Sequence, residues 1–210
     1  VERGDWFGHP ASLRWTEDYG NGERIPSSTE PAARTRKPAA AWIPYKWSRS
    51  TANLFMDQSQ GAFGPFAGQM ILGELTNGML LRADFEQVQG QWQGVVWPLR
   101  QEVGSICRIA QASDGSVFCG FTNRGWGGLS PGHGLARVRF TGVTPFEVLT
   151  ARATEDGFKL RFTQPIDPAS LTVAAAHVTQ YDYFDWWDYG SPQQNLTSRA
   201  VASWTMDADG

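Results

Sequence analysis

The fold is indicated by residues 70–85, MILGELTNGMLLRADF, because a similar segment follows downstream. The similar segment consists of VFCGFTN at residues 117–123 and GLARVRF at residues 134–140, with a glycine-rich insert between them. Each copy is an apolar run that ends in Gly, a Thr-Asn turn, and a second run with Arg three residues before Phe. Short apolar runs bounded by Gly or Asn indicate β-strands.

The spacing between the two copies indicates a repeat built from strands. Gly73 and Gly120 are 47 positions apart, whereas Arg82 and Arg137 are 55 positions apart because the insert lengthens the second copy. Repeats of about 40–50 residues made only of strands are typical of β-propeller blades. The alternative is two unrelated hairpins that share common strand residues. We predict propeller blades.

The composition fits a compact all-β protein. The chain has 210 residues, of which 41% are hydrophobic and 19% charged, with 23 Gly, 12 Pro and 10 Trp. This mixture excludes a disordered chain, a coiled coil and a long helical bundle. The net charge of −3 argues against a nucleic-acid partner. No apolar run approaches the roughly 18 residues of a membrane-spanning helix, so no membrane span is expected.

The pattern of residue types changes after Phe140. A Thr-Gly-Val-Thr-Pro linker at residues 141–145 precedes runs that alternate inward and outward like the strands of a β-sandwich. We predict the C-terminal blades of a β-propeller at residues 1–143 and an incomplete Ig-like β-sandwich at residues 144–210. The last residues suggest a strand without a return strand, so we expect a piece of a longer protein.

Several runs spread over nearly the whole chain share the motifs of one protein family. They are Gly4–Pro10, Phe63–Gly73, Ile106–Phe118, Asn123–Gly127, Thr141–Glu147, Phe162–Pro168 and Tyr189–Pro192. These runs resemble the glucose/sorbosone dehydrogenase-like β-propellers, in the version found in large multidomain bacterial proteins. Such proteins are typically secreted and often end in a c-type cytochrome domain. The resemblance therefore implies a periplasmic or extracellular location.

The resemblance also implies oxidation of a sugar or alcohol, with electrons passed to a cytochrome elsewhere in the full chain. The implied cofactors are pyrroloquinoline quinone and Ca²⁺. Basic side chains would hold the quinone carboxylates, an aromatic wall would stack on the ring, and a base would take the substrate proton. We predict that Lys46, Arg108 and Arg124 hold the carboxylates. The stacking wall is Trp126, with Trp47 as its alternative, and the base is His9.

Two features depart from the family pattern. Arg108 is followed by Ile109–Gln111, where the family commonly carries a second polar residue, and the family's catalytic His lies in an earlier blade. His9 stands in a Gly-His-Pro turn, so an ordinary hydrogen-bonded turn histidine is the alternative to a base. The three histidines lie too far apart in sequence to suggest a zinc site. No Cys-x-x-Cys-His motif occurs, so any haem would belong to another region.

The alternative function is ligand binding without catalysis. The glycine-rich insert at residues 124–134 lies between two strands of a predicted blade, which places it at a propeller rim where ligand loops occur. Trp126 on this loop could stack on a sugar or pack inward. We keep open a non-catalytic propeller that binds carbohydrate or a protein partner. Glycoside hydrolysis needs two facing carboxylates, and nothing in the sequence places Glu17, Asp18 or Glu86 across a cleft.

The two cysteines flank a predicted Asp114-Gly115 turn. With a two-residue loop, Cys107 faces Thr122 and Cys119 faces Ala110, so a disulfide would need a three-residue slip. We predict two free, buried thiols.

Overall fold

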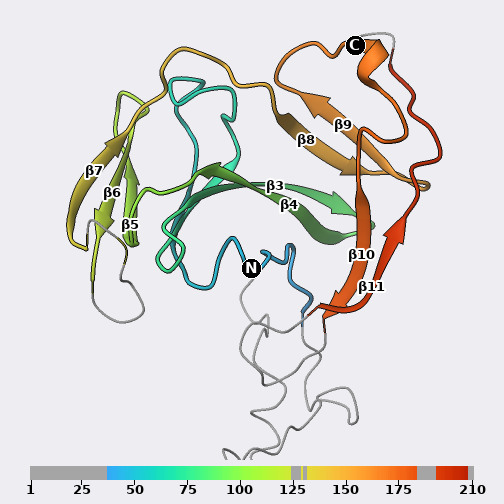
Figure 1. The fold of residues 1–210 in the computed structure, drawn as a ribbon. Helices are drawn as coiled ribbons and strands as arrows, with labels where there is room; N and C mark the ends of the chain where they lie inside the picture. Colours follow the sequence, from blue (N-terminus) through green and yellow to red (C-terminus); the bar gives the residue numbers. More distant parts are fainter. Residues whose placement is uncertain (1–36, 124–128, 130–131, 184–192, 208–210) are drawn as a thin grey trace, which may run out of the picture. The chain divides into compact units, whose positions relative to one another are not determined.

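The structure is a computed structural model that describes residues 37–123, 129, 132–183 and 193–207 (Figure 1). It consists of small antiparallel sheets, which confirms the predicted all-β class. Contacts divide the chain into two compact units, residues 40–165 and residues 1–39 with 166–210. Within the described ranges, no helix has the length and hydropathy of a membrane span.

The first sheet is a four-stranded meander in the unit 40–165. Its strands, each antiparallel to the next, are β1 (Thr51–Met56), β2 (Met70–Glu74), β3 (Leu80–Val88) and β4 (Gln91–Arg100). The turns follow from glycine, because Gly78 and Gly90 adopt φ values of 69° and 80°, a region that other residues rarely enter.

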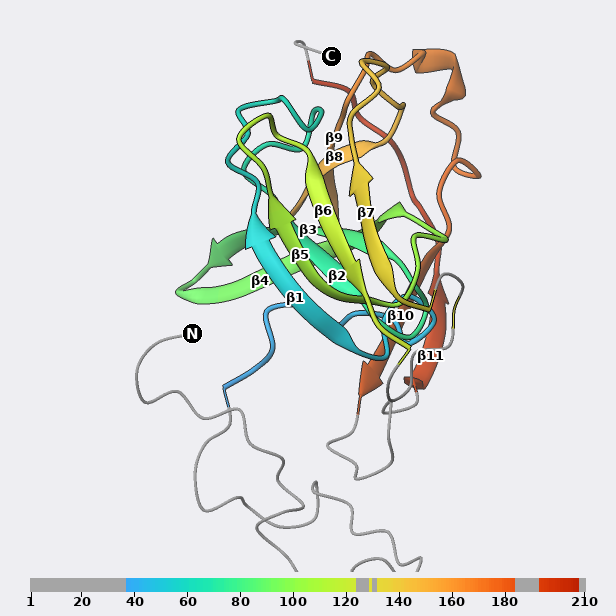
Figure 2. The same cartoon turned by 90° about the vertical axis from the view of Figure 1, so that its left-hand side faces the viewer.

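The second sheet belongs to the same unit and has three antiparallel strands. They are β5 (Ile106–Gln111), β6 (Val117–Phe121) and β7 (Gly134–Val138). Figure 2 shows β5 alongside β1 of the first sheet.

The repeat in the sequence is also a repeat of strand register. Gly73 pairs with Leu80 between β2 and β3. The equivalent Gly120 pairs with Leu135 between β6 and β7, so the insert between Asn123 and Gly134 leaves the pairing unchanged.

The strand that precedes each hairpin repeats as well. In β1 the register shifts between Thr51 and Asn53, and in β5 it shifts between Ile106 and Arg108, 55 positions later. A register shift at the same place in both sheets marks equivalent bulges. Strands β1–β3 and β5–β7 are therefore two copies of one three-stranded unit.

The two copies pack against each other through an apolar core. The front face of the first sheet includes Phe55, Ile71 and Leu80, and its back face includes Leu54 and Leu72. The front and back faces of the second sheet are those that carry the equivalent residues. The front face of the first sheet packs against the back face of the second. The buried residues of this core are Phe63, Ile71, Leu80, Ile106, Ile109, Val117, Cys119 and Phe121.

Gly73 permits the close approach of β5 to the front face of the first sheet. A Cβ at position 73 would lie 2.7 Å from Ile106 Cγ2 and 3.0 Å from Ile109 Cγ2. The Ile109 backbone N–H also donates to Asn53 Oδ1 at 2.9 Å. Glycine is needed here for space, since no other residue leaves room for both isoleucines.

The back face of the first sheet carries a second, smaller core. Its buried members are Leu72, Met79, Leu81 and Ala83. Ile43 and Trp47, from the segment before β1, pack against them.

A two-stranded sheet follows the two copies. It consists of β8 (Val148–Ala153) and β9 (Phe158–Phe162), and β8 contacts β3. The compact unit extends to residue 165 and includes both strands. The predicted domain boundary after residue 143 stays a prediction.

The described part of the other unit holds the 3₁₀-helix η3 (Pro168–Ser170) and the paired strands β10 (Val178–Tyr183) and β11 (Gln193–Arg199). The Asp167 carboxylate caps η3 by accepting from the Ala169 N–H at 2.9 Å. The Trp204 indole N–H donates to the Thr172 carbonyl at 2.7 Å.

Both cysteines are free, as predicted, but Cys107 is only half-buried and the predicted register was wrong. Cys119 pairs with Ile109, not with Ala110, because the turn has three residues. The Ala112 N–H donates to the Ser116 carbonyl at 2.8 Å, and Gly115 has a φ of 83°. This is the three-residue hairpin with a left-handed third position. Cys119 is buried and Cys107 half-buried, and burial raises the pKa of the Cys119 thiol to about 11.

We expect Gly73→Ala to destabilise the chain by about 1–3 kcal/mol, because the added methyl group overpacks the contact with Ile106 and Ile109. Gly120→Ala is the matched control: the nearest atoms to its Cβ position are those of Arg108 at 3.9 Å, so we expect a change within about 0.5 kcal/mol. Urea unfolding measures both. Equal effects at the two positions would contradict the packing described here.

Candidate functional site

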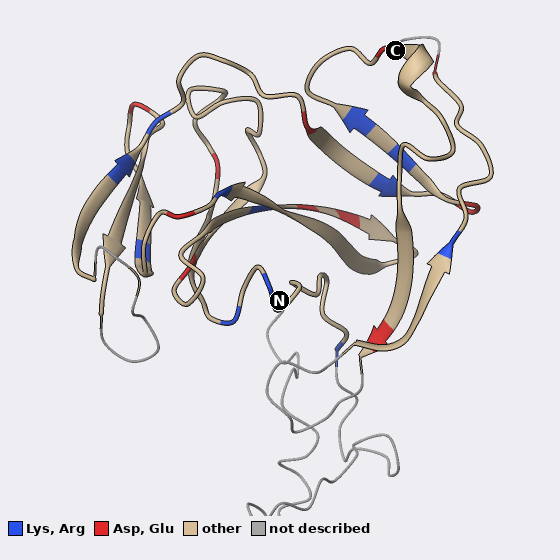
Figure 3. Ribbon diagram, in the orientation of Figure 1, with Lys and Arg blue, Asp and Glu red and all other residues tan. Residues whose placement is uncertain are grey.

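Three charged residues alternate along β3 on the face that β8 covers. Residues directly opposite each other in an antiparallel pair point to the same face, and Arg82 is opposite Ile71 of the front face. Asp84 and Glu86 follow at steps of two, so they share that face. We call Arg82, Asp84 and Glu86 the polar row. Figure 3 shows acidic positions on β3 and a basic position on β8.

Arg82 is fully buried, with 0% of its surface exposed. Its Nη1 donates to Gln69 Oε1 at 3.0 Å. Its Nη2 donates to Glu147 Oε2 at 3.1 Å and to the Val148 carbonyl at 2.7 Å. Gln69 in turn donates from Nε2 to the Leu149 carbonyl at 2.6 Å. The first sheet thereby holds two successive carbonyl groups of β8.

Two aromatic rings enclose the Arg82 guanidinium. Its central carbon lies 4.1 Å from the ring centroid of Phe66 and 4.2 Å from that of Trp97. Cation–π contacts of this kind are stronger when desolvated. Burial lowers the pKa of Arg82, and the hydrogen bond and charge of Glu147 act in the opposite direction.

Asp84 and Glu86 both meet Arg152 of β8. Asp84 Oδ2 accepts from Arg152 Nη1 at 2.6 Å, and Glu86 Oε2 lies 3.9 Å from Arg152 Nε. The side chains of Asp84 and Glu86 are 13% and 19% exposed, and that of Arg152 is 36% exposed. The hydrogen bond with Asp84 is the main cause that raises the pKa of Arg152.

Glu86 also binds the backbone of the covering hairpin. Its Oε1 accepts from the Ala153 N–H at 2.9 Å and from Gln93 Nε2 at 2.8 Å. These two hydrogen bonds, the first above all, lower the pKa of Glu86 below its ordinary value. Glu86 is therefore a carboxylate at neutral pH.

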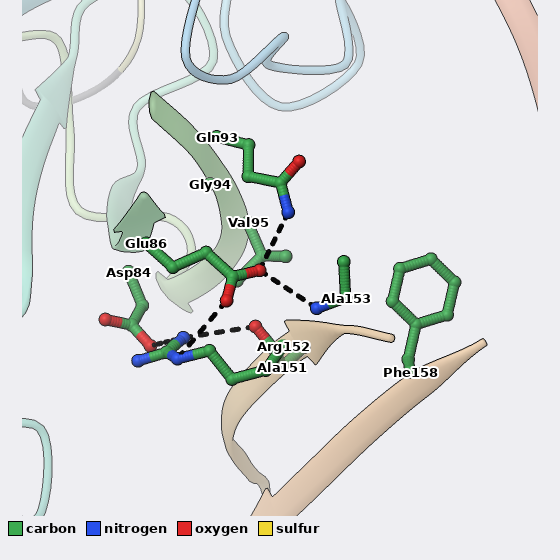
Figure 4. A pocket seen from close by; sticks show the side chains of 9 residues that line it. All are labelled: Asp84, Glu86, Gln93, Gly94, Val95, Ala151, Arg152, Ala153 and Phe158. Atoms are coloured by element: carbon green, nitrogen blue, oxygen red, sulfur yellow. Dashed lines mark hydrogen bonds and ion pairs between the residues drawn. The ribbon is translucent and has the colours of Figure 1, made fainter. Parts of the chain in front are cut away.

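A pocket of about 160 Å³ opens between the β3–β4 and β8–β9 hairpins (Figure 4). Asp84, Glu86, Gln93 and Arg152 supply its polar atoms, and Phe158 stands at its edge beyond Ala153. Phe158 is 65% exposed. The remaining lining residues are Gly94, Val95 and Ala151.

The polar atoms of this pocket keep spare hydrogen-bonding capacity. Glu86 Oε1 already accepts two hydrogen bonds, so the capacity of this carboxylate lies in Oε2, and the Gln93 amide has a carbonyl oxygen besides the Nε2 that binds Glu86. Arg152 has five N–H donors, of which Nη1 serves Asp84 and the Ala151 carbonyl. The surface of the pocket is mainly apolar, with a small polar part, and its lining residues include acceptors, a guanidinium donor and an exposed aromatic ring.

Two further buried carboxylates hold loops. Asp57 is 2% exposed, and its Oδ1 accepts from the Ser59 N–H at 2.9 Å and from Gln111 Nε2 at 2.6 Å. Its Oδ2 has no hydrogen-bond partner among the described residues. Glu74 is 0% exposed. Its two oxygens accept from four backbone N–H groups, those of Arg49, Ser50, Asn77 and Gly78.

In the described part of the chain, no group of three or more His, Cys, Asp or Glu side chains is placed to hold a metal ion. His9, Arg124 and Trp126, predicted as base, carboxylate ligand and stacking wall, lie outside the described residues.

Lys46 and Arg108, the other two predicted cofactor ligands, are exposed and lie on different elements. Lys46 Nζ lies 5.5 Å from the ring centroid of Trp47, which packs against the back-face core. Arg108 Nη1 donates to the carbonyls of Ala52 and Cys107 at 3.5 and 3.4 Å. Neither lines the pocket of the polar row, so the assignment of a quinone site to these residues stays a prediction.

In comparisons with known proteins, no protein-family model, curated protein or solved structure matches the chain.

Of the residues that line this pocket, Glu86 is the one named from the sequence, whereas its partners Asp84, Gln93, Arg152 and Phe158 were missed. Arg82, Asp84 and Glu86 alternate with Ala83, Phe85 and Gln87 along a predicted strand. Charges at period two ordinarily indicate a strand face turned toward water, so this pattern gives no sign of the elements that cover the face.

We expect the pKa of Glu86 to lie below its ordinary value and to rise more in Gln93→Leu than in Arg152→Met, since Arg152 is a smaller cause than Gln93. A lowered pKa means that the Glu86 carboxylate stabilises the folded chain above the ordinary pKa. That contribution is lost as the pH falls through the lowered value. Carbon-13 NMR titration of the side-chain carboxyl measures both. A larger change in Arg152→Met would contradict the order of causes.

Proposed function

We propose that this chain is part of a β-propeller of the glucose/sorbosone dehydrogenase-like kind and that it binds carbohydrate. The repeated register of β1–β3 and β5–β7 supports the propeller, because propellers are built from copies of one antiparallel meander packed face to face. The two-stranded sheets β8–β9 and β10–β11 are the proposed Ig-like segment.

The pocket of the polar row is the main observation that supports carbohydrate binding. Sugars present vicinal hydroxyl groups, which donate to carboxylates and accept from guanidinium groups. Glu86, Gln93 and Arg152 provide such groups within one pocket. Phe158 adds an exposed ring face that suits stacking on the apolar face of a sugar.

The size of the pocket limits what it can bind. At about 160 Å³ it is smaller than the roughly 300–1,000 Å³ of drug-sized ligand sites. A ligand of about a dozen heavy atoms at roughly −0.3 kcal/mol per atom binds with a Kd on the order of 1 mM. We therefore propose that the pocket accepts one sugar unit, as the end or a branch of a longer glycan.

Oxidation of the bound sugar remains a proposal from the resemblance. It requires the quinone, and His9, Arg124 and Trp126 would have to supply the base, a carboxylate ligand and the stacking wall. A periplasmic or extracellular location would bring such a protein to polysaccharide substrates.

The test is an NMR titration of the chain with glucose, galactose and mannose. We expect at least one sugar to shift the Ala153 and Phe158 amide signals with a Kd on the order of 1 mM. Phe158→Ala should weaken binding about threefold to tenfold through loss of the ring contact.

The matched control is Trp92→Ala. Trp92 is 55% exposed and lies in the same β3–β4 hairpin, opposite Gln87 and so on the other face from Glu86. Its loss should leave the affinity unchanged. If no sugar shifts the Ala153 signal, or if Trp92→Ala weakens binding as much as Phe158→Ala, the pocket is not the carbohydrate site.

A further inference from the structure

Among the described residues of the unit 40–165, each copy of the three-stranded unit has one face that no other strand covers. On the second sheet this is the front face, formed by Arg108, Ala110, Phe118, Gly120, Leu135 and Arg137. On the first sheet it is the β1 part of the back face, formed by Leu54 and Met56. Leu135 is 70% exposed, Leu54 51% and Met56 44%.

The interface between the first and the second sheet shows which kind of face packs against each of these two faces. The front face of the first sheet, at Gly73 and Leu80, is covered by Ile106 and Ile109 from the back face of the second sheet. A front face and a back face of this repeat are thus complementary: glycine on one side makes room for aliphatic side chains on the other.

The open front face repeats the surface that is covered in the first copy. Gly120 and Leu135 are the equivalents of Gly73 and Leu80, and they pair with each other in the same way. Leu80 is 0% exposed under the second sheet, whereas Leu135 is 70% exposed. Within the part of the chain that the structure describes, a Cβ at Gly120 would have no neighbour closer than the Arg108 atoms at 3.9 Å.

The open back face of the first sheet is equivalent to the back face of the second sheet, which covers the front face of the first. Leu54 is the equivalent of Ile109, because each pairs with the equivalent residue of the next strand, Leu72 and Cys119. Ile109 is 7% exposed in the interface, whereas Leu54 is 51% exposed. The strand that makes most of the contact in the interface is β5, and its equivalent is β1.

We propose that a second copy of this chain docks head to tail, with its Leu54 and Met56 seated over Gly120 and Leu135. The contact continues the interface between the two sheets, using the same two kinds of face, which in the proposed propeller are the faces that meet between neighbouring blades. Each copy carries one face of each kind, so the interface is heterologous and allows assemblies larger than a dimer.

The intermolecular contact is weaker than the one it continues. Arg108 replaces Asn53, so the acceptor that binds the Ile109 N–H has no equivalent. Thr51 replaces Ile106, which removes one aliphatic side chain from the contact. The assembly is therefore expected at high protein concentration and not as a permanent complex.

The test is sedimentation analysis of the chain up to about 1 mM. We expect the average mass to rise with concentration beyond that of a dimer. Gly120→Ile fills the front face, and Leu54→Asp places a charge on the back face; each variant alone should be monomeric. An equimolar mixture of the two variants should form a one-to-one dimer, because each retains the face that the other lacks.

Val143→Asp is the control, since Val143 is 74% exposed and lies on neither face; it should associate like the unchanged chain. If Gly120→Ile does not fold, as judged by its thermal unfolding, Leu135→Asp replaces it. A chain that stays monomeric at 1 mM, a mixture that stays monomeric, or an equal loss of association in Val143→Asp overturns the proposal. The carbohydrate pocket uses other residues, so failure here leaves that proposal standing.

Discussion

The buried guanidinium of Arg82 is the interaction on which the arrangement of the unit 40–165 depends. It lies between Phe66 and Trp97 and joins β3 to Gln69, Glu147 and the backbone of β8. Arg82 is fully buried, so loss of its partners would leave its charge without compensation, although water screens Glu147, whose side chain is 36% exposed. Arg82 thus fixes the covering hairpin over the polar row, and the pocket exists because that hairpin is held there.

The equivalent residue in the second copy shows how one position of the repeat has diverged. Arg137 pairs with Asp114 and Ser116 within its own sheet and lies over Phe118. It is exposed, and the front face around it is open. The same residue type at the same register therefore binds a covering element in one copy and the β5–β6 turn of its own sheet in the other.

The repeat could be predicted from the sequence because it depends on local patterns: strands bounded by Gly and Asn, and a glycine where sheets approach closely. The hairpin before Val117 was misjudged because Asp114-Gly115 suggests a two-residue turn, whereas Ser113 also belongs to the loop. The pocket could not be predicted. It depends on Asp84 and Glu86 meeting Arg152, nearly 70 positions away, and a charged residue gives no sign of its distant partner.

The central claim is that Arg82 fixes β8 and β9 to the first sheet, and amide hydrogen exchange tests it most directly. Arg82→Met keeps the volume of the side chain but removes its hydrogen bonds. We predict that protection falls selectively at the paired amides of β8 and β9, while β5–β7 exchange as in the unchanged chain. Unchanged protection in β8 and β9, or an equal loss in both regions, would contradict the claim.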